Sequence, residues 1–373
     1  MYESFKAKYS IQCSYYLYRQ IVSELNISFA KLGNEECFTC EKYEIHTKES
    51  SHVLDDGLVC PECETYKNHR EKFIKAREMY NADSRSSGDS RVYTADLQKV
   101  IMLPRCDTFK EIIFTPRLIA FNESFVPVGT SKTSTVAVLW HEAISGRKKA
   151  DIVSTFYAFL NKIRDSEEVV IWLDNCSGQN KNWCLYTFFV YAVNSLELNI
   201  RKITLRYFES GHTFMAADSF HHRVEQSLNR QGKVYDFVDF VNAVKTSTRN
   251  VEVIDMAFND FYNWKDESSQ YKITRLVPRP YLQQMVEVQF MRGFHTLDYK
   301  TSFEGEVISA NFLKANIQKN GIAKPLSISQ PRGITMERKQ NIITKIGQIM
   351  PPNRITFWKN IFVSENVDTI IDD

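Results

Sequence analysis

The 373-residue sequence lacks several features that would assign it to a common class. It has no run of about 18 apolar residues, so we expect no membrane-spanning helix and no membrane partner. Its first residues, MYESFKAKYSIQ, have neither an apolar stretch nor a small-residue cleavage site, unlike a secretory signal. The glycine patterns of P-loop and dinucleotide-binding folds and the G-x-S-x-G elbow of hydrolases are also absent. We therefore expect a location in the cytosol or nucleus, where cysteines stay reduced.

Excess charge of one sign is also missing. Forty-seven Lys and Arg residues against 45 Asp and Glu residues leave a formal net charge of +2. A nucleic-acid surface would therefore have to be a local patch rather than a property of the whole chain. The hydrophobic fraction of 43% and the charged fraction of 25% are typical of a soluble globular protein. Disorder, collagen and coiled coil are thereby excluded for the chain as a whole.

The chain divides into three regions by composition and pattern. Residues 1–85 are helical and contain a cysteine cluster, and the segment SRSSGDS at 84–90 has the composition of a linker. Residues 86–232 alternate short apolar runs with helical segments, and residues 233–373 form an α+β extension with weaker signals. We find no internal repeat. The middle region predicts an α/β fold with a mixed sheet flanked by helices. Its predicted strands cover 91–103, 118–128, 135–143, 169–175 and 203–209, and its helices cover 150–163, 181–196 and 219–230.

Four of the eight cysteines form two C-x-x-C pairs, with 19 residues between the pairs. Each such turn places two thiolates on one side of the backbone, as two corners of a tetrahedral zinc site require. Two turns at this separation are typical of a closed, structural four-thiolate site. His46 and His69 follow the pairs at similar distances, and either could replace a cysteine, or both could contribute to a second ion. We predict structural Zn²⁺ bound by Cys37, Cys40, Cys60 and Cys63.

Three acidic residues stand at informative places in the middle region. Asp96 interrupts the strand-like run VYTADLQKV, Asp174 ends the apolar run VVIWL, and Glu225 lies on the helix after the next strand. Attack on a phosphodiester uses two divalent ions, and ions such as Mg²⁺ or Mn²⁺ need oxygen ligands. Carboxylates from separate strands can converge at one end of a sheet to supply them. We predict that these three residues form a ribonuclease-H-like catalytic metal site.

Other polar residues near these acids have two possible roles. Asp218 is an alternative third acid, although it could instead cap the helix that carries Glu225. A helix would place both on one face together with His221. The turn after Asp174 is rich in amides, which could orient phosphate or simply form a tight turn. The residues that we expect to position DNA or phosphate are Asn175, Gln179, Asn180 and His221.

Several segments together resemble a known family. They are SYYLYRQIVSELNISFAKL, CFTC, CPEC, VYTADLQKV, VLWHEAISG, WLDNCSGQNKN and GHTFMAADSFHHRVEQ, in this order. The chain resembles a group of transposon-derived animal proteins over nearly its whole length. These look like cut-and-paste DDE transposases with a ribonuclease-H-like core. The resemblance implies Asp96, Asp174 and Glu225 as the catalytic triad, with two Mg²⁺ or Mn²⁺ ions. It also implies DNA as the partner, a homo-oligomeric state and a nuclear location.

Two other functions remain open from the residues alone. The same core could belong to a ribonuclease-H-like exonuclease, which would release mononucleotides from DNA ends. Alternatively, the chain could be a catalytically inactive, transposon-derived module that binds DNA or protein. Such a module would bind DNA independently of Mg²⁺ and would cleave no strand.

Overall fold

The computed structural model describes residues 2–9, 12–24, 37–50, 60–86, 90–106, 109–129 and 133–371. The chain divides into two compact units, Met1–Glu35 and Glu36–Asp373. The first unit contains the helices α1 (Tyr2–Tyr9) and α2 (Tyr15–Glu24). They pack through aromatic rings, and the ring centroid of Tyr2 lies 5.4 Å from those of Tyr15 and Tyr18. Among the described helices, none is both long and apolar enough to span a membrane.

The second unit begins with two helices, α3 (Phe38–Ser50) and α4 (Pro61–Arg85). The rings of Tyr43 and Tyr66 stack in parallel with centroids 3.8 Å apart and join the two helices. Helix α4 continues into the predicted linker at 84–90. The two helices therefore form a hairpin that carries both C-x-x-C pairs.

Five strands form the middle of the sheet, in the order β4-β3-β1-β5-β6. Strand β3 runs antiparallel to both β1 and β4, whereas β5 and β6 run parallel to β1. Every residue of β4 is buried, as expected for a strand covered on both faces. The bounds are β1 (Arg91–Leu97), β3 (Leu118–Pro127), β4 (Thr135–His141), β5 (Glu168–Leu173) and β6 (Lys202–Tyr207).

Residues beyond 232 extend the same sheet at both edges. Strand β7 pairs parallel with β4, and β8 pairs antiparallel with β6, followed by β9 and β10. The short strand β2 pairs with β3 off the main path. The C-terminal region is thus continuous with the α/β region rather than separated from it. The bounds are β2 (Ile101–Leu103), β7 (Val251–Asp255), β8 (Glu287–Met291), β9 (Leu297–Lys300) and β10 (Ile308–Ala310).

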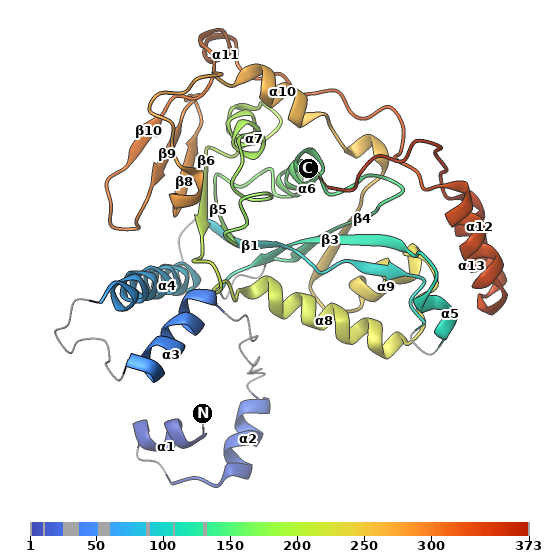
Figure 1. Ribbon diagram of the computed structural model, residues 1–373, viewed down its shortest axis with the longest axis horizontal. Coiled ribbons are helices and arrows are strands. Elements are labelled where there is room, and N and C mark those ends of the chain that lie inside the picture. The colour runs from blue at the N-terminus through green and yellow to red at the C-terminus, as the bar shows by residue number, and fades with distance from the viewer. Residues whose placement is uncertain are drawn as a thin grey trace. The chain divides into compact units, whose positions relative to one another are not determined.

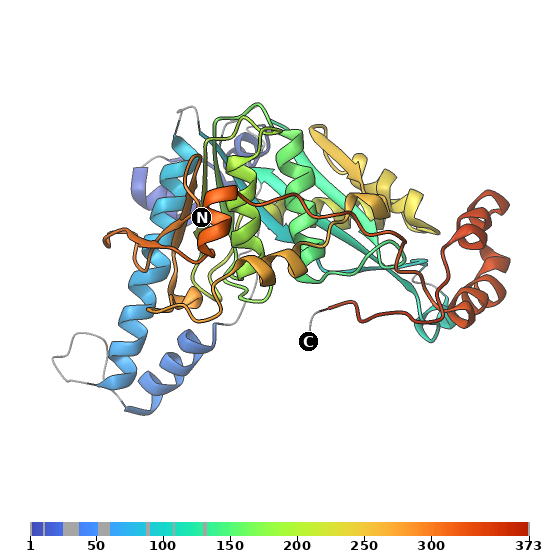
Figure 2. The same cartoon turned by 90° about the horizontal axis from the view of Figure 1, so that it is seen from above.

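Helices cover both faces of the sheet (Figures 1 and 2). Alternate residues of β4 enter different cores, because successive side chains of a strand point to opposite faces. Val136 and Val138 pack in the core beneath α6 and α7, whereas Ala137 and Leu139 pack in the core beneath α8 and α9. The bounds are α6 (Lys149–Lys162), α7 (Trp183–Asn194), α8 (Ala216–Gln231) and α9 (Phe237–Lys245). The α/β class and the mixed sheet flanked by helices are confirmed, but the sheet has ten strands in the described residues and includes those of the predicted C-terminal extension.

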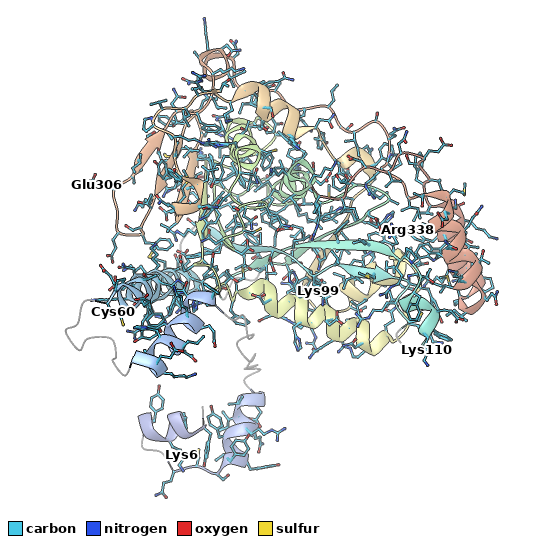
Figure 3. All side chains as sticks on the ribbon, in the orientation of Figure 1. Lys6, Cys60, Lys99, Lys110, Glu306 and Arg338 are labelled. Carbon is cyan, nitrogen blue, oxygen red and sulfur yellow. The ribbon has the colours of Figure 1, made fainter. Side chains whose placement is uncertain are left out.

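The C-terminal helices dock on the far end of this sheet through a buried carboxylate. Glu142, directly after β4, is fully buried, and its Oε1 accepts a 2.5 Å hydrogen bond from Arg338. Arg332 lies 3.4 Å from the other oxygen. Figure 3 labels Arg338 on α12, at the opposite end of the molecule from Cys60 on the hairpin. The remaining helices are α5 (Lys110–Ile113), α10 (Trp264–Tyr271), α11 (Ala315–Asn320), α12 (Met336–Lys345) and α13 (Pro352–Asn360), with 3-10 turns at Phe258–Asp260, Leu282–Gln284 and Gly347–Ile349.

Candidate active site and metal-binding groups

Asp96 and Asp174 stand at the same level of neighbouring parallel strands. In the register of β1 and β5, Thr94 lies beside Trp172, and each aspartate follows two residues later. Parallel strands end at the same edge of a sheet and lie about 4.8 Å apart. The two predicted carboxylates are therefore brought together from positions 78 residues apart in the chain.

A buried acid, Glu123, lies on the adjacent strand β3 and was not among the sequence-predicted site residues. Its backbone pairs with Leu97 on β1, one position beyond Asp96, so its side chain leaves the sheet on the face opposite to that of Asp96. Glu123 is 3% exposed. Burial, followed by the negative charges of Asp96 and Asp174, raises the pKa of its carboxyl well above the usual value. The polar run Asn-Glu-Ser inside the apolar strand LIAFNESFVPV is the sequence signal that could have identified it.

His221 faces Asp96 from α8. Its Nδ1 lies 3.5 Å from Oδ2 of Asp96. Its Nε2 is buried and has no hydrogen-bond partner among the described residues. Burial lowers the pKa of His221 to about 3, so the imidazole is neutral at physiological pH. If Nδ1 carries the proton and donates it to Asp96, then Nε2 presents an unused lone pair.

The two candidate third acids on α8 have other contacts. Glu225, one turn beyond His221, pairs with Arg105, whose Nη2 lies 2.7 Å from Oε1. Asp218 accepts a 2.8 Å hydrogen bond from the backbone N–H of Met215 and thereby caps the first turn of α8. Asp218 therefore has the capping role that was one of its two predicted roles. Glu225 would have to leave Arg105 in order to bind a metal ion.

The amide-rich turn after β5 orients Asp174. Oδ1 of Asp174 accepts hydrogen bonds from the backbone N–H of Cys176 at 3.0 Å and from Nδ2 of Asn180 at 2.5 Å. Asn180 is itself fixed in position, because its backbone carbonyl accepts a 2.8 Å hydrogen bond from the Tyr207 hydroxyl. The carbonyl of Gln179 accepts a hydrogen bond from the side chain of the residue that caps α7, at 2.9 Å. Of the predicted amides, Asn180 thus contacts the acid directly.

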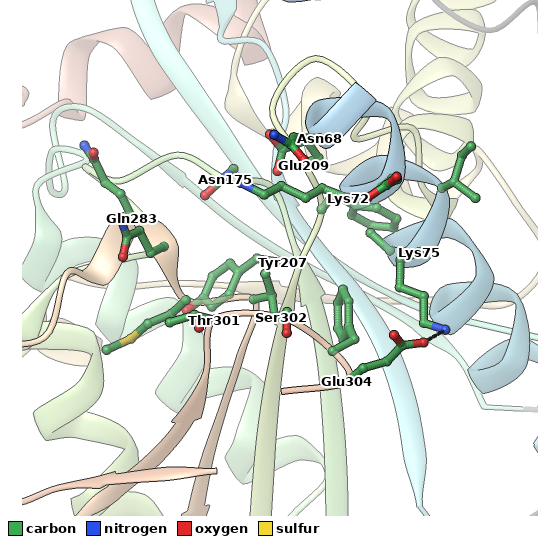
Figure 4. Close-up of a pocket in the computed structure, with 18 of the residues that line it drawn as sticks. Asn68, Lys72, Lys75, Asn175, Tyr207, Glu209, Gln283, Thr301, Ser302 and Glu304 are labelled. Atoms are coloured by element: carbon green, nitrogen blue, oxygen red, sulfur yellow. Dashed lines mark ion pairs between the residues drawn. The ribbon is translucent and has the colours of Figure 1, made fainter. Parts of the chain in front are cut away.

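Asn175 lines a pocket beside this turn. The pocket has a volume of about 890 Å³ and lies between α4, the turn after β5 and the strand ends near Tyr207. Figure 4 shows Asn175 close to Lys72 and Glu209 on one side, and the ion pair of Lys75 with Glu304 on another. The lining includes both lysines and carboxylates, so neither positive nor negative charge dominates it. The pocket is next to Asp174 and has room for a substrate group.

A second site is built from cysteines and histidines. One ligand atom each from Cys37, Cys40, His69 and His212 lies within 4.8 Å of all the others. Cys37 Sγ lies 3.1 Å from His69 Nε2, and Cys40 Sγ lies 3.3 Å from His212 Nε2. Burial and the adjacent Cys37 thiol raise the pKa of Cys40 to about 11, so a cation would have to displace its proton. His212 was not a predicted ligand.

His46, Cys60 and Cys63 form another such group, with Cys60 Sγ 3.2 Å from His46 Nε2. The structure thus distributes the four predicted cysteines over two Cys/His groups instead of gathering them around one centre. Both histidines that the sequence left as possible ligands belong to a group. The structure therefore contains groups that could hold metal ions, and their donors are thiol sulfurs and imidazole nitrogens.

Comparison with known proteins adds little to this geometry. A family model described as a domain of unknown function, DUF7869, matches residues 150–295. This range includes Asp174, His212 and His221 but neither Asp96 nor the two C-x-x-C pairs. No curated protein matches the sequence. A solved structure titled "Crystal structure of NurA with manganese" has 10% identity over 66% of this chain and 85% of that one, with a TM-score of 0.18. That similarity is too low to establish a shared fold.

Proposed function

We propose that this protein is a DDE-type transposase, or a domesticated derivative of one, that cleaves and joins DNA by two-metal-ion phosphoryl transfer. The observation that carries the proposal is the pair of Asp96 and Asp174, which stand at the same level of adjacent parallel strands. Two carboxylates at one edge of a sheet supply the oxygen ligands that a divalent cation needs.

The order of the strands supports the ribonuclease-H-like core that the resemblance implies. An antiparallel sheet of β1, β3 and β4 is followed by β5 and β6, each after a helix and each parallel to β1. In this arrangement β1 is central, and the acid of β1 lies at the level of the acid that follows β5. Two of the segments that carry the resemblance, VYTADLQKV and WLDNCSGQNKN, contain these two acids.

In the proposed site Asp96 and Asp174 would hold Mg²⁺ or Mn²⁺. Such ions would stabilise the attacking and leaving oxygens of the phosphodiester. Asn180 fixes the rotamer of Asp174, and the turn that contains Asn175 opens to the pocket. Water and then a DNA 3′-hydroxyl would be the nucleophiles. DNA as partner, assembly into a homo-oligomer and a nuclear location belong to the same proposal.

Glu225 is the candidate third ligand that the resemblance implies, and its recorded ion pair is with Arg105. His221 has a different role in the proposed site. If its Nδ1 donates to Asp96, Nε2 points away from that carboxylate and cannot bind the same ion, so we propose that His221 orients Asp96 for metal binding.

Zinc is our proposal for the ions of the Cys/His groups. Thiolate and imidazole donors suit Zn²⁺, whereas Mg²⁺ and Mn²⁺ prefer carboxylate oxygens. The Cys/His groups should therefore take up Zn²⁺ before the carboxylate site does. The carboxylate site can then be titrated with Mn²⁺ when zinc is supplied only in the amount that saturates the Cys/His groups, because excess Zn²⁺ would compete with Mn²⁺.

The test is Mn²⁺ binding by calorimetry in the presence of saturating zinc. We expect Asp174→Asn and Asp96→Asn to abolish the binding seen with the wild type, and Asp165→Asn, at an exposed aspartate, to leave it unchanged. Equal binding by the wild type and Asp174→Asn would remove this residue from the metal site and overturn the proposed mechanism.

A second measurement separates the rival functions once binding is established. Mn²⁺-dependent nicking and joining of duplex DNA supports a transposase, whereas release of mononucleotides from DNA ends supports an exonuclease. DNA binding that is independent of Mn²⁺ and produces no cleavage supports the inactive module.

A further inference from the structure

The two Cys/His groups arise from a sequence repeat that extends beyond the cysteines. CFTCEKYEIH at 37–46 and CPECETYKNH at 60–69 share the pattern C-x-x-C-E-x-Y-x-x-H, with a separation of 23 residues. The finding corrects the expectation that the chain has no internal repeat. The repeated tyrosines, Tyr43 and Tyr66, are the pair that stacks between α3 and α4.

The histidines of the two repeats are exchanged in the structure. The cysteines of the first repeat lie with His69 of the second, and the cysteines of the second repeat lie with His46 of the first. Each group therefore joins the start of one helix to a position two turns into the other. If all four cysteines bound one ion, neither histidine would help to connect the two helices.

The first group has tetrahedral dimensions. Its measured ligand separations are 3.1 Å between Cys37 Sγ and His69 Nε2, 3.3 Å between Cys40 Sγ and His212 Nε2, and 3.1 Å between the two Nε2 atoms. Zinc bonds of about 2.1 Å to nitrogen and 2.3 Å to sulfur imply edges of about 3.3–3.8 Å. An ion at the centre would move these atoms apart by only a few tenths of an ångström.

The fourth donor of this group, His212, comes from outside the hairpin, in the loop between β6 and α8. Its ring stacks on Phe73 of α4 with centroids 3.9 Å apart, and its carbonyl accepts a hydrogen bond from Arg77 at 3.3 Å. The same loop contributes Glu209, whose carboxylate lies 3.2 Å from His69 Nδ1. A carboxylate at Nδ1 keeps the proton there and leaves Nε2 free for a metal, as in many zinc sites.

The loop also approaches the first cysteine closely. Gly211 has a φ of +76°, and a Cβ at this position would lie 2.8 Å from Cys37 Cβ. Such an approach admits only glycine at this point. The sequence Gly-His therefore does two things, because the glycine allows the contact and the histidine directs its Nε2 into the group.

We propose that the protein binds two zinc ions and that the first, held by Cys37, Cys40, His69 and His212, fastens the helical hairpin to the loop between β6 and α8. The second ion takes His46, Cys60 and Cys63 and lies wholly on the hairpin. This inference rests on the zinc part of the proposed function and is independent of the carboxylate site, whose failure to bind Mn²⁺ would leave the zinc count unchanged. The zinc ion would nevertheless help to position the carboxylate site, because the loop that it fastens leads directly into the helix that carries His221.

The decisive experiment measures zinc per chain by native mass spectrometry of the full-length protein. We expect two zinc ions in the wild type, one in His212→Ala and one in His46→Ala. His222→Ala, at an exposed histidine of α8, should retain both ions and is the matched control. A single four-cysteine site predicts one zinc ion in the wild type, unchanged by either histidine substitution.

A second variant guards against loss of zinc through misfolding. His212→Cys should restore two ions per chain, because it replaces one zinc ligand by another. In the Co²⁺-substituted protein, the thiolate-to-cobalt absorption of the His212-containing site should then rise about 1.5-fold, from two thiolates to three. Zinc content that stays at two in His212→Ala, with unchanged circular dichroism, would overturn the assignment of His212. Zinc content of one in the wild type would overturn the two-ion arrangement.

Discussion

His221 approaches Asp96 with one ring nitrogen and keeps the other free. Nδ1 lies 3.5 Å from the Asp96 carboxylate, and Nε2 is buried without a hydrogen-bond partner among the described residues. A histidine that contacts a metal-binding carboxylate through Nδ1 fixes the orientation of that carboxylate. The pair therefore supports His221 as a residue that positions Asp96 in the proposed metal site.

Replacement of His221 is expected to weaken Mn²⁺ binding more than replacement of Glu225. We expect His221→Ala to reduce Mn²⁺ affinity by about 10- to 100-fold, the range found when the support of a metal site is removed. Glu225→Gln should change it less than threefold, because Arg105 already pairs with this carboxylate. Calorimetry with saturating zinc measures both, and His222→Ala serves as the control. The reverse order of effects would identify Glu225 as the third ligand.

The buried acid Glu123 should make the metal-free protein less stable as the pH rises. Its folded-state pKa is raised, so the unfolded chain releases this proton at a lower pH than the folded chain does. The stabilisation is complete below about pH 4.3 and is lost as the pH rises toward the raised pKa, at up to about 1.4 kcal/mol per pH unit. Glu123→Gln should remove this dependence. Urea unfolding from pH 5 to 8 without added Mg²⁺ or Mn²⁺ measures the difference, and parallel curves for both proteins would contradict the expectation.

His141 should produce the opposite dependence on the acid side. Burial between Phe237 and Phe357 lowers its pKa to about 3, whereas the unfolded chain titrates near 6.5. Its stabilising effect is present above about pH 6.5 and is lost progressively as the pH falls toward 3. We expect the stability difference between the wild type and His141→Gln to shrink by about 1.4 kcal/mol per pH unit in this window. Unfolding curves at pH 6.5, 5.5 and 4.5 test it, and a constant difference would refute it.

The buried carboxylate of Glu142 should hold the C-terminal helices in place. Glu142→Gln removes the charge that Arg338 and Arg332 share, which leaves two guanidinium groups without their partner. Breaking a buried ion pair in this way costs about 3–5 kcal/mol. Glu337→Gln, at an exposed position of α12, is the matched control. Urea unfolding and the rate of proteolysis within α12 and α13 should both respond, and an unchanged rate would show that these helices dock by other contacts.

Gly211 gives a test of the loop contact that leaves every zinc ligand intact. Gly211→Ala places a Cβ 2.8 Å from Cys37 Cβ at a positive φ, which costs about 1–2 kcal/mol in backbone conformation alone. We expect zinc release to a chelator to be faster for one of the two ions, with the other unaffected. Gly178→Ala is the control, because a Cβ there meets no atom within 4 Å. Equal release rates in both variants would show that the loop does not approach the cysteines.

The sequence alone determined the α/β class and the positions of most central strands. Apolar runs such as VVIWL become buried strands because they satisfy both faces of a covered sheet. Asp96 and Asp174 could be selected because a carboxylate inside or at the end of such a run is costly without a role. The C-x-x-C spacing likewise predicted metal ligands, because it depends on local turn geometry alone.

Only the tertiary structure decided which residues meet across the chain. Glu123 lies near the two aspartates because the register of β1 and β3 pairs it with Leu97, next to Asp96, and register between strands is a long-range property. His212 meets the cysteines across more than 170 residues, and the partner of each C-x-x-C pair depends on how α3 and α4 cross. Spacing along a chain reports local geometry, whereas these contacts depend on packing between elements that the chain brings together only when it folds.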